Sequence, residues 1–354
     1  MRSKEKCFSV RPIPFLVSGL MAFGMSAAHA QSAALEEVIV TAQKRSENLQ
    51  DVPISVQALN TKALEKAGII SLSDIKAQVP GLTIDSYPGS SEMLYPSIRG
   101  IVPNSIQTSV PIPMAIHLDG VALTQLAGLN LAGADLERIE VLKGPQGVLA
   151  GRNATGGAIN IVTARPELGR FGFKQQVTVA EHGQWLSKTV VNVPVTDDFA
   201  AKISYLHSER DNIGIKNSAP NGPKLGEKTA DSWRLDLRWR ASNNVMVDYG
   251  YDRSQTDSID VPNQCLVPFM SSTLPMIAPI DPRVSSMING CSLSKLTSLN
   301  VPFHMPKNRN IAEGHNLTVN WDVSPTLTFR SITGYRKVDT KNNCLVPPGY
   351  KHVF

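Results

Sequence analysis

The stretch DLERIEVLKGPQGVLAGRNATGGAINIVTAR, residues 135–165, decides how the rest of the sequence is interpreted. It predicts two short strands, Ile139 to Leu142 and Ala158 to Thr163, separated by turns at Lys143-Gly144-Pro145, Gly147, Gly151 and Gly156-Gly157. A phosphate-binding loop needs a Lys and a hydroxyl that open a helix, but Gly151 is followed by Arg152-Asn153 and then a strand. We therefore exclude a nucleotide site and expect a compact unit packed inside something larger.

This stretch closely resembles the end of the plug domain of TonB-dependent outer-membrane receptors. Two earlier pieces, Ser97-Ile98-Arg99-Gly100-Ile101 and His117-Leu118-Asp119-Gly120-Val121, resemble the same family in the same order. The resemblance covers Glu36 to about Arg165. The plug-motif residues it marks are Arg99, Gly100, Asp119, Gly120, Glu140, Lys143, Gly144, Pro145, Gly151, Arg152, Gly156 and Gly157.

The first 30 residues have the pattern of a secretory signal peptide, with a basic start, an apolar run from Ile13 to Met25 and a small-residue exit at Ala28-His29-Ala30. Without this leader the formal net charge falls from +5 to about +2, so the basic pI is no argument for nucleic-acid binding. Elsewhere no stretch approaches the ~20 apolar residues of a spanning helix.

Export also bears on the cysteines. Cys7 lies in the leader, and the oxidising compartment makes Cys265 and Cys291 a candidate disulfide that leaves Cys344 unpaired. Their spacing predicts no metal site.

The arm after the leader contains a short β-branched run that can add as a strand to the sheet edge of a partner. In the family it resembles the TonB box, which binds the TonB energy-coupling protein. The alternative is that Val38 to Thr41 is the first strand of the globular domain. The predicted TonB-binding residues are Glu36, Glu37, Val38, Ile39, Val40, Thr41 and Ala42.

The next segment, Gln50 to Arg165, predicts a small α+β domain. We expect a strand at Pro53 to Val56, a helix at Thr61 to Ala67 capped by Thr61, a helical turn at Ser73 to Ala77, a strand at Leu82 to Ile84, and a strand at Ala115 to Val121 that turns at Asp119-Gly120. We interpret Arg99 as an internal charge paired with Glu137 or Glu140.

Two polar stretches, Ser86 to Tyr95 and Val102 to Pro113, are expected to be loops, either contacting a ligand or acting as solvated connectors. The candidate ligand-binding residues are Ser86, Tyr87, Ser90, Ser91, Glu92, Tyr95, Asn104 and Gln107. No catalytic constellation or paired metal ligands emerge, so we predict no enzyme activity, cofactor or metal.

Beyond Pro166 the sequence alternates apolar and polar residues in seven segments, as transmembrane barrel strands do. The clearest has Trp233, Leu235, Leu237 and Trp239 against Arg234, Asp236, Arg238 and Arg240. The others are near residues 171–179, 185–195, 199–207, 245–252, 317–323 and 327–336.

The connections between these segments favour a membrane barrel over a soluble sandwich. Alternate connections, Pro194 to Asp198, Ala241 to Asn244 and Ser324 to Thr326, are all short, whereas two of the opposite three are long. The aromatic residues Trp185, Trp233, Trp239, Tyr249, Tyr251 and Trp321 lie towards strand ends, where an interfacial girdle is expected.

The predicted fold is therefore an α+β plug followed by an antiparallel transmembrane β-barrel that is incomplete in this chain, because a lumen holding a plug needs about 22 strands. We expect a signal peptide at 1–30, the arm at 31–49, the plug at 50–166 and the first part of the barrel at 167–354.

The resemblance implies a receptor in the outer membrane of a Gram-negative bacterium, surrounded by lipid, that imports a scarce solute with energy from TonB. A ferric siderophore is the first expectation, and cobalamin or an oligosaccharide the next. The alternative, from a different class, is a truncated, non-transporting fragment made of the plug and unclosed strands.

Overall fold

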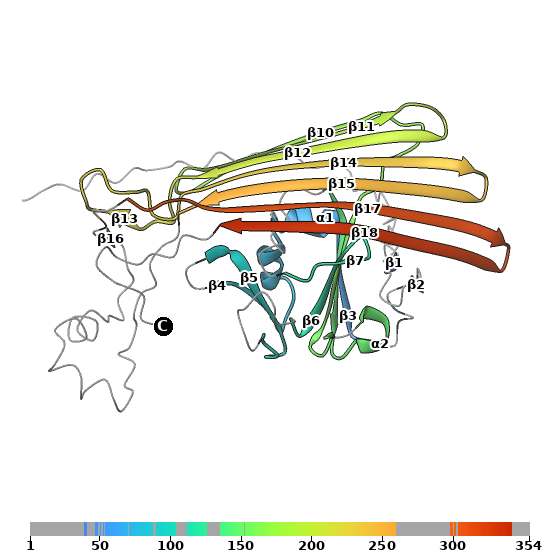
Figure 1. Ribbon diagram of the computed structural model, residues 1–354, viewed down its shortest axis with the longest axis horizontal. Coiled ribbons are helices and arrows are strands. Elements are labelled where there is room, and N and C mark those ends of the chain that lie inside the picture. Colours follow the sequence, from blue (N-terminus) through green and yellow to red (C-terminus); the bar gives the residue numbers. More distant parts are fainter. Residues whose placement is uncertain are drawn as a thin grey trace, which may run out of the picture. The chain divides into compact units, whose positions relative to one another are not determined.

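The structure of the chain is a computed structural model. It describes residues 54–69, 71–87, 90–103, 112–125, 135–151, 153–259 and 304–341, with the pieces 39–40, 47–48 and 298–299 and the single residues 50, 52 and 301. The described part contains two principal sheets (Figure 1).

The smaller sheet has five strands in the order β3-β8-β9-β6-β7. Their bounds are Val56–Asn60 (β3), Leu136–Lys143 (β8), Gly157–Thr163 (β9), Met114–Leu118 (β6) and Val121–Ala122 (β7). Strands β6 and β9 are parallel, and the other neighbours are antiparallel. The strands expected within 135–165 and the turn at Asp119-Gly120 are confirmed. The strand expected at Pro53 to Val56 is displaced, because β3 starts at Val56.

Three short helical segments accompany this sheet: α1 (Thr61–Lys66), the 3₁₀ segment η1 (Leu72–Ala77) and α2 (Gly147–Ala150). The predicted cap at Thr61 was wrong by one position. The Asn60 side chain accepts the Ala63 N–H, while the Thr61 hydroxyl donates to the Glu137 carbonyl at 2.9 Å and so ties α1 to β8. Helix α2 was expected only as a turn.

A two-stranded hairpin completes the unit, with β4 at Leu82–Tyr87 and β5 at Ser90–Ile98. The prediction of a loop from Ser86 to Tyr95 was therefore wrong. Polar side chains do not exclude a strand that has one wet face, and backbone pairing from Leu82 with Ile98 to Ser86 with Leu94 decides the structure. We call this hairpin, the five-stranded sheet and the helices the plug.

The plug has its own hydrophobic core, which explains why these short elements are stable together. Ile75 of η1, Ile84 of β4, Ile98 of β5, Ile116 of β6 and Ile159 of β9 are all fully buried in one cluster. Fully burying a side chain of this size contributes roughly 1.5–3 kcal/mol.

Four residues of the arm are described, two in each of two short strands, and Ile39 and Val40 are the two that belong to the predicted TonB-binding run. Strand β1 (Ile39–Val40) pairs antiparallel with β2 (Glu47–Asn48), and Val40 packs in a small cluster with Val52, Leu142 and Ala158. At these two residues the structure agrees with the alternative that the run is the first strand of the globular domain. Glu36, Glu37, Val38, Thr41 and Ala42 lie outside the described residues.

The larger sheet, which we call the wall, has seven strands in the order β10-β11-β12-β14-β15-β17-β18. Their bounds are Gly172–Ala180, Gln184–Pro194, Phe199–Arg210, Lys228–Ser242, Val245–Ser258, Asn308–Ser324 and Leu327–Lys341. Every pair of neighbours is antiparallel, so all seven predicted strands are confirmed in chain order.

The turns of the wall also agree with the prediction. Residues 195–198, 243–244 and 325–326 make the short returns, while 211–227 and 259–307 are long connections at the other end (Figure 1). Several strands extend further than expected towards the long connections. There both faces of a strand are polar, as at Asn308 and Arg309, so the alternation that predicts a membrane strand is absent. Within the long connections, β13 (Lys216–Asn217) pairs with β16 (Ser298–Leu299).

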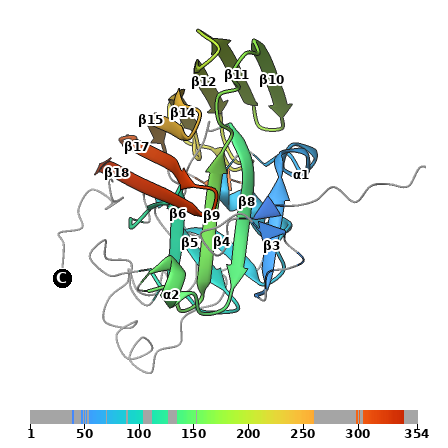
Figure 2. The ribbon, with the colours of Figure 1, turned by 90° about the vertical axis from the view of Figure 1, so that its right-hand side faces the viewer.

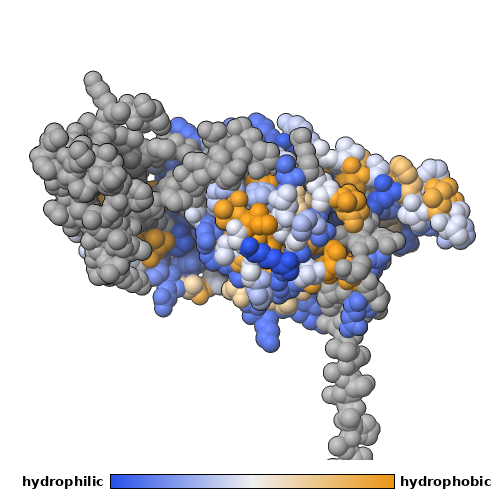
Figure 3. Space-filling model, turned by 90° about the horizontal axis from the view of Figure 1, so that it is seen from below, coloured by the Kyte–Doolittle hydropathy of each residue, from blue (hydrophilic) through white to orange (hydrophobic). Residues whose placement is uncertain are grey.

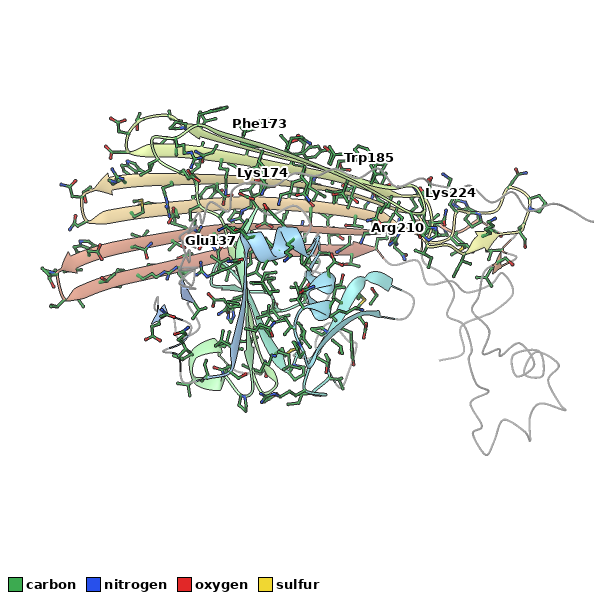
Figure 4. The ribbon with its side chains drawn as sticks, turned by 180° about the vertical axis from the view of Figure 1, so that it is seen from behind. Glu137, Phe173, Lys174, Trp185, Arg210 and Lys224 are labelled. Atoms are coloured by element: carbon green, nitrogen blue, oxygen red, sulfur yellow. The ribbon has the colours of Figure 1, made fainter. Side chains whose placement is uncertain are left out.

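The two faces of the wall differ in polarity in the opposite sense to a soluble protein. Trp233 and Trp239 are about half exposed, at 52% and 51%, whereas Arg234 and Asp236 between them are 4% and 1% exposed. In Figure 4, Phe173 points away from the plug, while its neighbour Lys174 points towards α1, where it pairs with Glu65. Hydrophobic groups are also visible at the short-turn end of the strands in Figure 3.

Aromatic side chains form two rows on the apolar face of the wall. Phe199 and Tyr205 on β12, Trp233 and Trp239 on β14, and Phe329 and Tyr335 on β18 are each six residues apart, about 20 Å along a strand. Tyr205 stacks on Trp233 with ring centroids 4.0 Å apart. No described helix is long and apolar enough to cross a membrane.

Replacing Gly157 by Ala should destabilise the plug by at least about 3 kcal/mol. Its φ is 152°, and an added Cβ would lie 2.2 Å from the Leu142 carbonyl oxygen, which belongs to the backbone and cannot move aside. Urea unfolding of the refolded protein measures the loss. Gly68→Ala is the matched control, because Gly68 also has a positive φ, 63°, but has open space around it, so only about 1 kcal/mol is expected. Equal losses in the two variants would contradict this account of the β8–β9 contact.

Candidate functional site

The contact between the plug and the wall is centred on Arg234 of β14. Its Nη2 lies 2.8 Å from Asp119 Oδ2 of the plug and 2.7 Å from Asp236 Oδ1, and its Nη1 lies 3.7 Å from Asp252 Oδ1. We call these four residues the anchor. A guanidinium group buried this deeply is tolerated only when carboxylates and hydrogen bonds replace its water.

Asp119 is the plug's side of the anchor, and every part of it is engaged. Its carboxylate accepts the Thr163 N–H and the Thr163 hydroxyl, both at 2.9 Å, as well as the Arg234 guanidinium. Its own carbonyl accepts from the Asn316 side chain of β17 at 3.1 Å. The predicted plug-motif turn at Asp119-Gly120 is therefore the point where the plug meets the wall.

Asp119 remains ionised in spite of its burial. Burial raises the pKa of this carboxyl, but the charges of Arg234 and Arg165 and the hydrogen bonds from Thr163 outweigh that effect, so the pKa lies below its usual value of 3.8. The anchor is thus an ion pair at any pH above about 4.

A second ionic contact lies at Asp135, the residue that precedes β8. Lys202 of β12 approaches its Oδ2 at 3.2 Å, and Lys188 of β11 approaches its Oδ1 at 3.9 Å. The Lys202 ammonium also donates to the Ala164 carbonyl at the end of β9. With Lys174 of β10 on Glu65 of α1, strands β10, β11, β12 and β14 all bind the plug by charge.

The charged network continues along the inner face of the wall. Arg336 of β18 makes a two-point contact with Asp252, at 2.7 and 3.0 Å, and Arg238 of β14 makes another with Asp248, at 2.7 and 3.1 Å. Two-point contacts of this kind fix orientation as well as charge. The inner face therefore holds its ions in a set geometry.

The β6–β7 turn also fits the wall by shape. A Cβ on Gly334 of β18 would lie 2.4 Å from Val121 Cγ2, and a Cβ on Gly120 would lie 2.8 Å from Ile332 Cδ1. Gly334 therefore leaves the space that Val121 fills, and the turn rests on β18 without an intervening side chain.

Arg99, another plug-motif residue, is not the internal charge paired with Glu137 or Glu140 that we predicted, so that prediction was wrong. Arg99 is exposed at a left-handed position with φ of 53°, close to Gly81 and Gly144. Arg138 forms the described ion pairs of both Glu137 and Glu140, and Glu140 also accepts from Asn160 at 3.2 Å. The signal was present in the sequence, because Arg138 and Glu140 lie two residues apart and so share a face of β8.

The remaining plug-motif residues close the glycine-rich turn between β8 and β9. Gly144 N donates to the Gly156 carbonyl at 3.1 Å, and Gly156 N donates to the Pro113 carbonyl at 2.9 Å. Lys143 N donates to the Ser55 carbonyl, which ties the turn to the segment before β3. Pro145 follows β8, Gly151 ends α2, and Arg152 lies outside the described residues.

The proposed ligand residues are brought together only in part. Ser86, Tyr87, Ser90, Ser91, Glu92 and Tyr95 all lie on the β4–β5 hairpin, and the Tyr95 hydroxyl donates to the Pro103 carbonyl. Asn104 and Gln107 lie outside the described residues, as do Cys265, Cys291 and Cys344.

The anchor was missed by sequence reasoning, although part of its signal was present. Arg234, Asp236 and Arg238 were placed on the wet face of a strand, but nothing indicated that Asp119, 115 residues away, is the partner. The sequence does place positive and negative side chains together on one face of this strand, while its other face carries two tryptophans. Such charges need partners when they are buried.

Comparisons with known proteins agree with this architecture. Residues 48–158 match the family model described as the TonB-dependent receptor plug domain. The pesticin receptor of Yersinia pestis is 27% identical over 231 residues, which are 64% of this chain and 33% of that protein. The vitamin B12 transporter BtuB of Vibrio vulnificus is 31% identical over 144 residues, 39% of this chain and 22% of that protein.

A solved structure shares the fold across most of the described chain. The crystal structure of the ferric yersiniabactin uptake receptor FyuA from Yersinia pestis has a TM-score of 0.65 at 20% identity, covering 81% of this chain and 41% of that one. The chain spans about a third of the length of the pesticin receptor.

Arg234→Met should destabilise the seating of the plug by about 3–5 kcal/mol, because it leaves Asp119 and Asp236 buried without their cation. Urea unfolding of the refolded protein measures the change. Arg309→Met is the matched control: Arg309 is exposed, so the loss of its pair with Asp257 should change the stability far less. A similar small loss in both variants would show that the anchor does not hold the plug.

The anchor should also weaken in acid. The pKa of Asp119 is lower in the folded protein than in the unfolded chain. The ionised carboxylate therefore contributes fully to the free energy of unfolding above the unfolded pKa of about 3.9, and this contribution is lost as the pH falls through the lower folded value. We expect the urea midpoint to fall more steeply below pH 4 for the native protein than for Asp119→Asn, whose amide does not titrate. Parallel pH profiles would exclude Asp119 as the ionised partner.

Proposed function

We propose that this protein captures a scarce solute outside the cell and imports it with energy supplied by TonB. The reason is that the chain carries the plug domain of TonB-dependent receptors beside seven strands of a receptor wall. The protein is an outer-membrane protein of a Gram-negative bacterium. The transport step and its energy source are our proposal for the whole receptor.

The observation that carries this proposal is the ionic seating of the plug on the wall. Arg234 binds Asp119, and Lys202 binds Asp135, so two separate points of the plug are held by buried or nearly buried charges. A plug fixed in this way opens only rarely by thermal motion, since separating such pairs costs several kcal/mol. Import past it therefore requires work.

Tight capture gives a second reason for an energy source. A solute bound with nanomolar affinity is held by about 12 kcal/mol, which must be overcome for release on the inner side. The outer membrane has no nucleotide supply of its own, so the work has to reach the plug through a partner. We propose that this partner is TonB and that it binds the arm.

The arm is suited to that role by its position in the sequence and its composition. Its run of β-branched residues, Val38 to Thr41, can pair with the exposed strand of a partner. Strand β1 lies within this run and pairs with only two residues, so a partner strand would compete with a short ladder.

We propose a ferric siderophore as the solute. The pesticin receptor matches 64% of this chain, against 39% for the vitamin B12 transporter, and the structural relative is named for the uptake of ferric yersiniabactin. Cobalamin is the second candidate, favoured by the higher identity of that shorter match. No catalytic step is part of the proposed function.

Val38→Pro should abolish uptake of ferric yersiniabactin by energised cells while leaving its capture at the cell surface unchanged. Proline has no N–H to donate, so the arm cannot pair fully with a partner strand. Uptake and surface binding of ⁵⁵Fe-labelled chelate measure the two steps separately, with Val38→Thr as the matched β-branched control. Normal uptake in the proline variant would contradict the role of the arm, and absence of binding by the native receptor would contradict the proposed solute.

A further inference from the structure

A cavity of about 370 Å³ lies between the plug sheet and β18 of the wall. Its lining includes Arg138 and Asn160 of the plug, Arg165 after β9, and Arg330 and Ile332 of β18. Strand β18 runs beside β6 and β9 in Figure 2, and β7 contacts it. The volume falls within the range of small-molecule sites, and three guanidinium groups line it.

Arg165 has hydrogen-bonding capacity that the described residues do not use. Its side chain is 16% exposed, and its nearest carboxylate oxygen, Asp119 Oδ1, is 3.6 Å away, beyond hydrogen-bonding distance. That carboxylate is already bound by Thr163 and Arg234. A guanidinium group has five N–H donors, and polar groups this deeply placed normally have partners.

Arg330 is the second available cation of the cavity. Within the part of the chain that the structure describes it has no ion pair, in contrast to Arg138, which is held by Glu137 and Glu140. Arg165 comes from the plug and Arg330 from the wall, so an anion between them would bind both parts at once.

The cavity reaches from the anchor towards the short-turn end of β18, since Asp119 and Arg330 both line it. Arg336 shares a row of the sheet with Asp252 and Arg234, whereas Arg330 shares a row with Met246 and Arg240. The two rows are six residues apart, about 20 Å along a strand. A solute entering from the long-connection end would meet the row of the anchor before it reached Arg330.

We propose that this cavity is a second binding site, between Arg165 and Arg330, for an anionic iron chelate that bears carboxylate oxygens. Planar guanidinium groups match carboxylates in two-point contacts. The described residues offer no cluster of three His, Cys, Asp or Glu suited to a metal ion, so the chelate would be held through its own oxygens. The inference rests on the proposed import function, because it places this site on the inward path.

The test is equilibrium binding of ⁵⁵Fe-citrate, an anionic carboxylate chelate, to the complete receptor purified in detergent. Arg330→Glu should weaken this binding at least tenfold and Arg330→Gln about fivefold, whereas Arg240→Glu should bind as the native protein does. Arg240 lies in the same row of the sheet but pairs with Asp198 and does not line the cavity. A neutral ferric trihydroxamate chelate should be insensitive to all three substitutions.

Several results would overturn the proposal. These are unaltered citrate-chelate binding in Arg330→Glu and Arg330→Gln, an equal loss in Arg240→Glu, or no saturable binding of ⁵⁵Fe-citrate to the native protein. Circular dichroism and resistance to urea show whether each variant is folded. The assay needs no energy source, so failure of energised uptake would count against the proposed function alone, and failure here against the second site alone.

Discussion

The burial of one guanidinium group, that of Arg234, is the constraint on which the rest of the structure depends. It lies among Asp119, Asp236 and Asp252, and only the first of these belongs to the plug. Removing the plug would expose or strand a charge on each side, so the two parts are stable together rather than separately. Because Asp119 lies at the β6–β7 turn, the same ion pair fixes where the plug sheet meets the wall, and Gly334 provides the room for Val121 beside it.

The arrangement of the wall follows from what lies on each side of it. One face meets the plug and holds Arg234, Asp236 and Lys202, while the other presents Trp233 and Trp239 outward. A soluble protein would bury the tryptophans and expose the ions. Lipid on the outer side reverses that preference, because an apolar environment favours exposed aromatic rings. On the inner side the plug supplies partners for the buried charges. The proposed transport role uses this geometry. In that proposal the bound plug closes the path, and work applied through the arm opens it.

Much of this fold could be predicted from the sequence, because alternation and turn residues are local signals. All seven wall strands and their short returns appear in chain order, and the Asp119-Gly120 turn is where it was expected. The errors have local causes as well: Asn60 rather than Thr61 caps α1, and the polar part of the hairpin from Ser86 to Tyr95 was predicted to be a loop. The site itself was harder to predict. The Arg234 pair with Asp119 depends on which strands become neighbours in space, and no spacing rule encodes that. The pairing of Glu140 with Arg138 was missed although it lies within β8, where residues two apart share a face.

The central claim, a wall with a lipid-facing apolar side and an ion-bearing side turned to the plug, can be tested with the protein's own fluorescence. All four tryptophans, Trp185, Trp233, Trp239 and Trp321, are on the outer face. In vesicles of lipids with brominated acyl chains, the account predicts strong quenching of the tryptophan emission and little further quenching by aqueous iodide. Emission that is quenched by iodide and unaffected by brominated chains would contradict it.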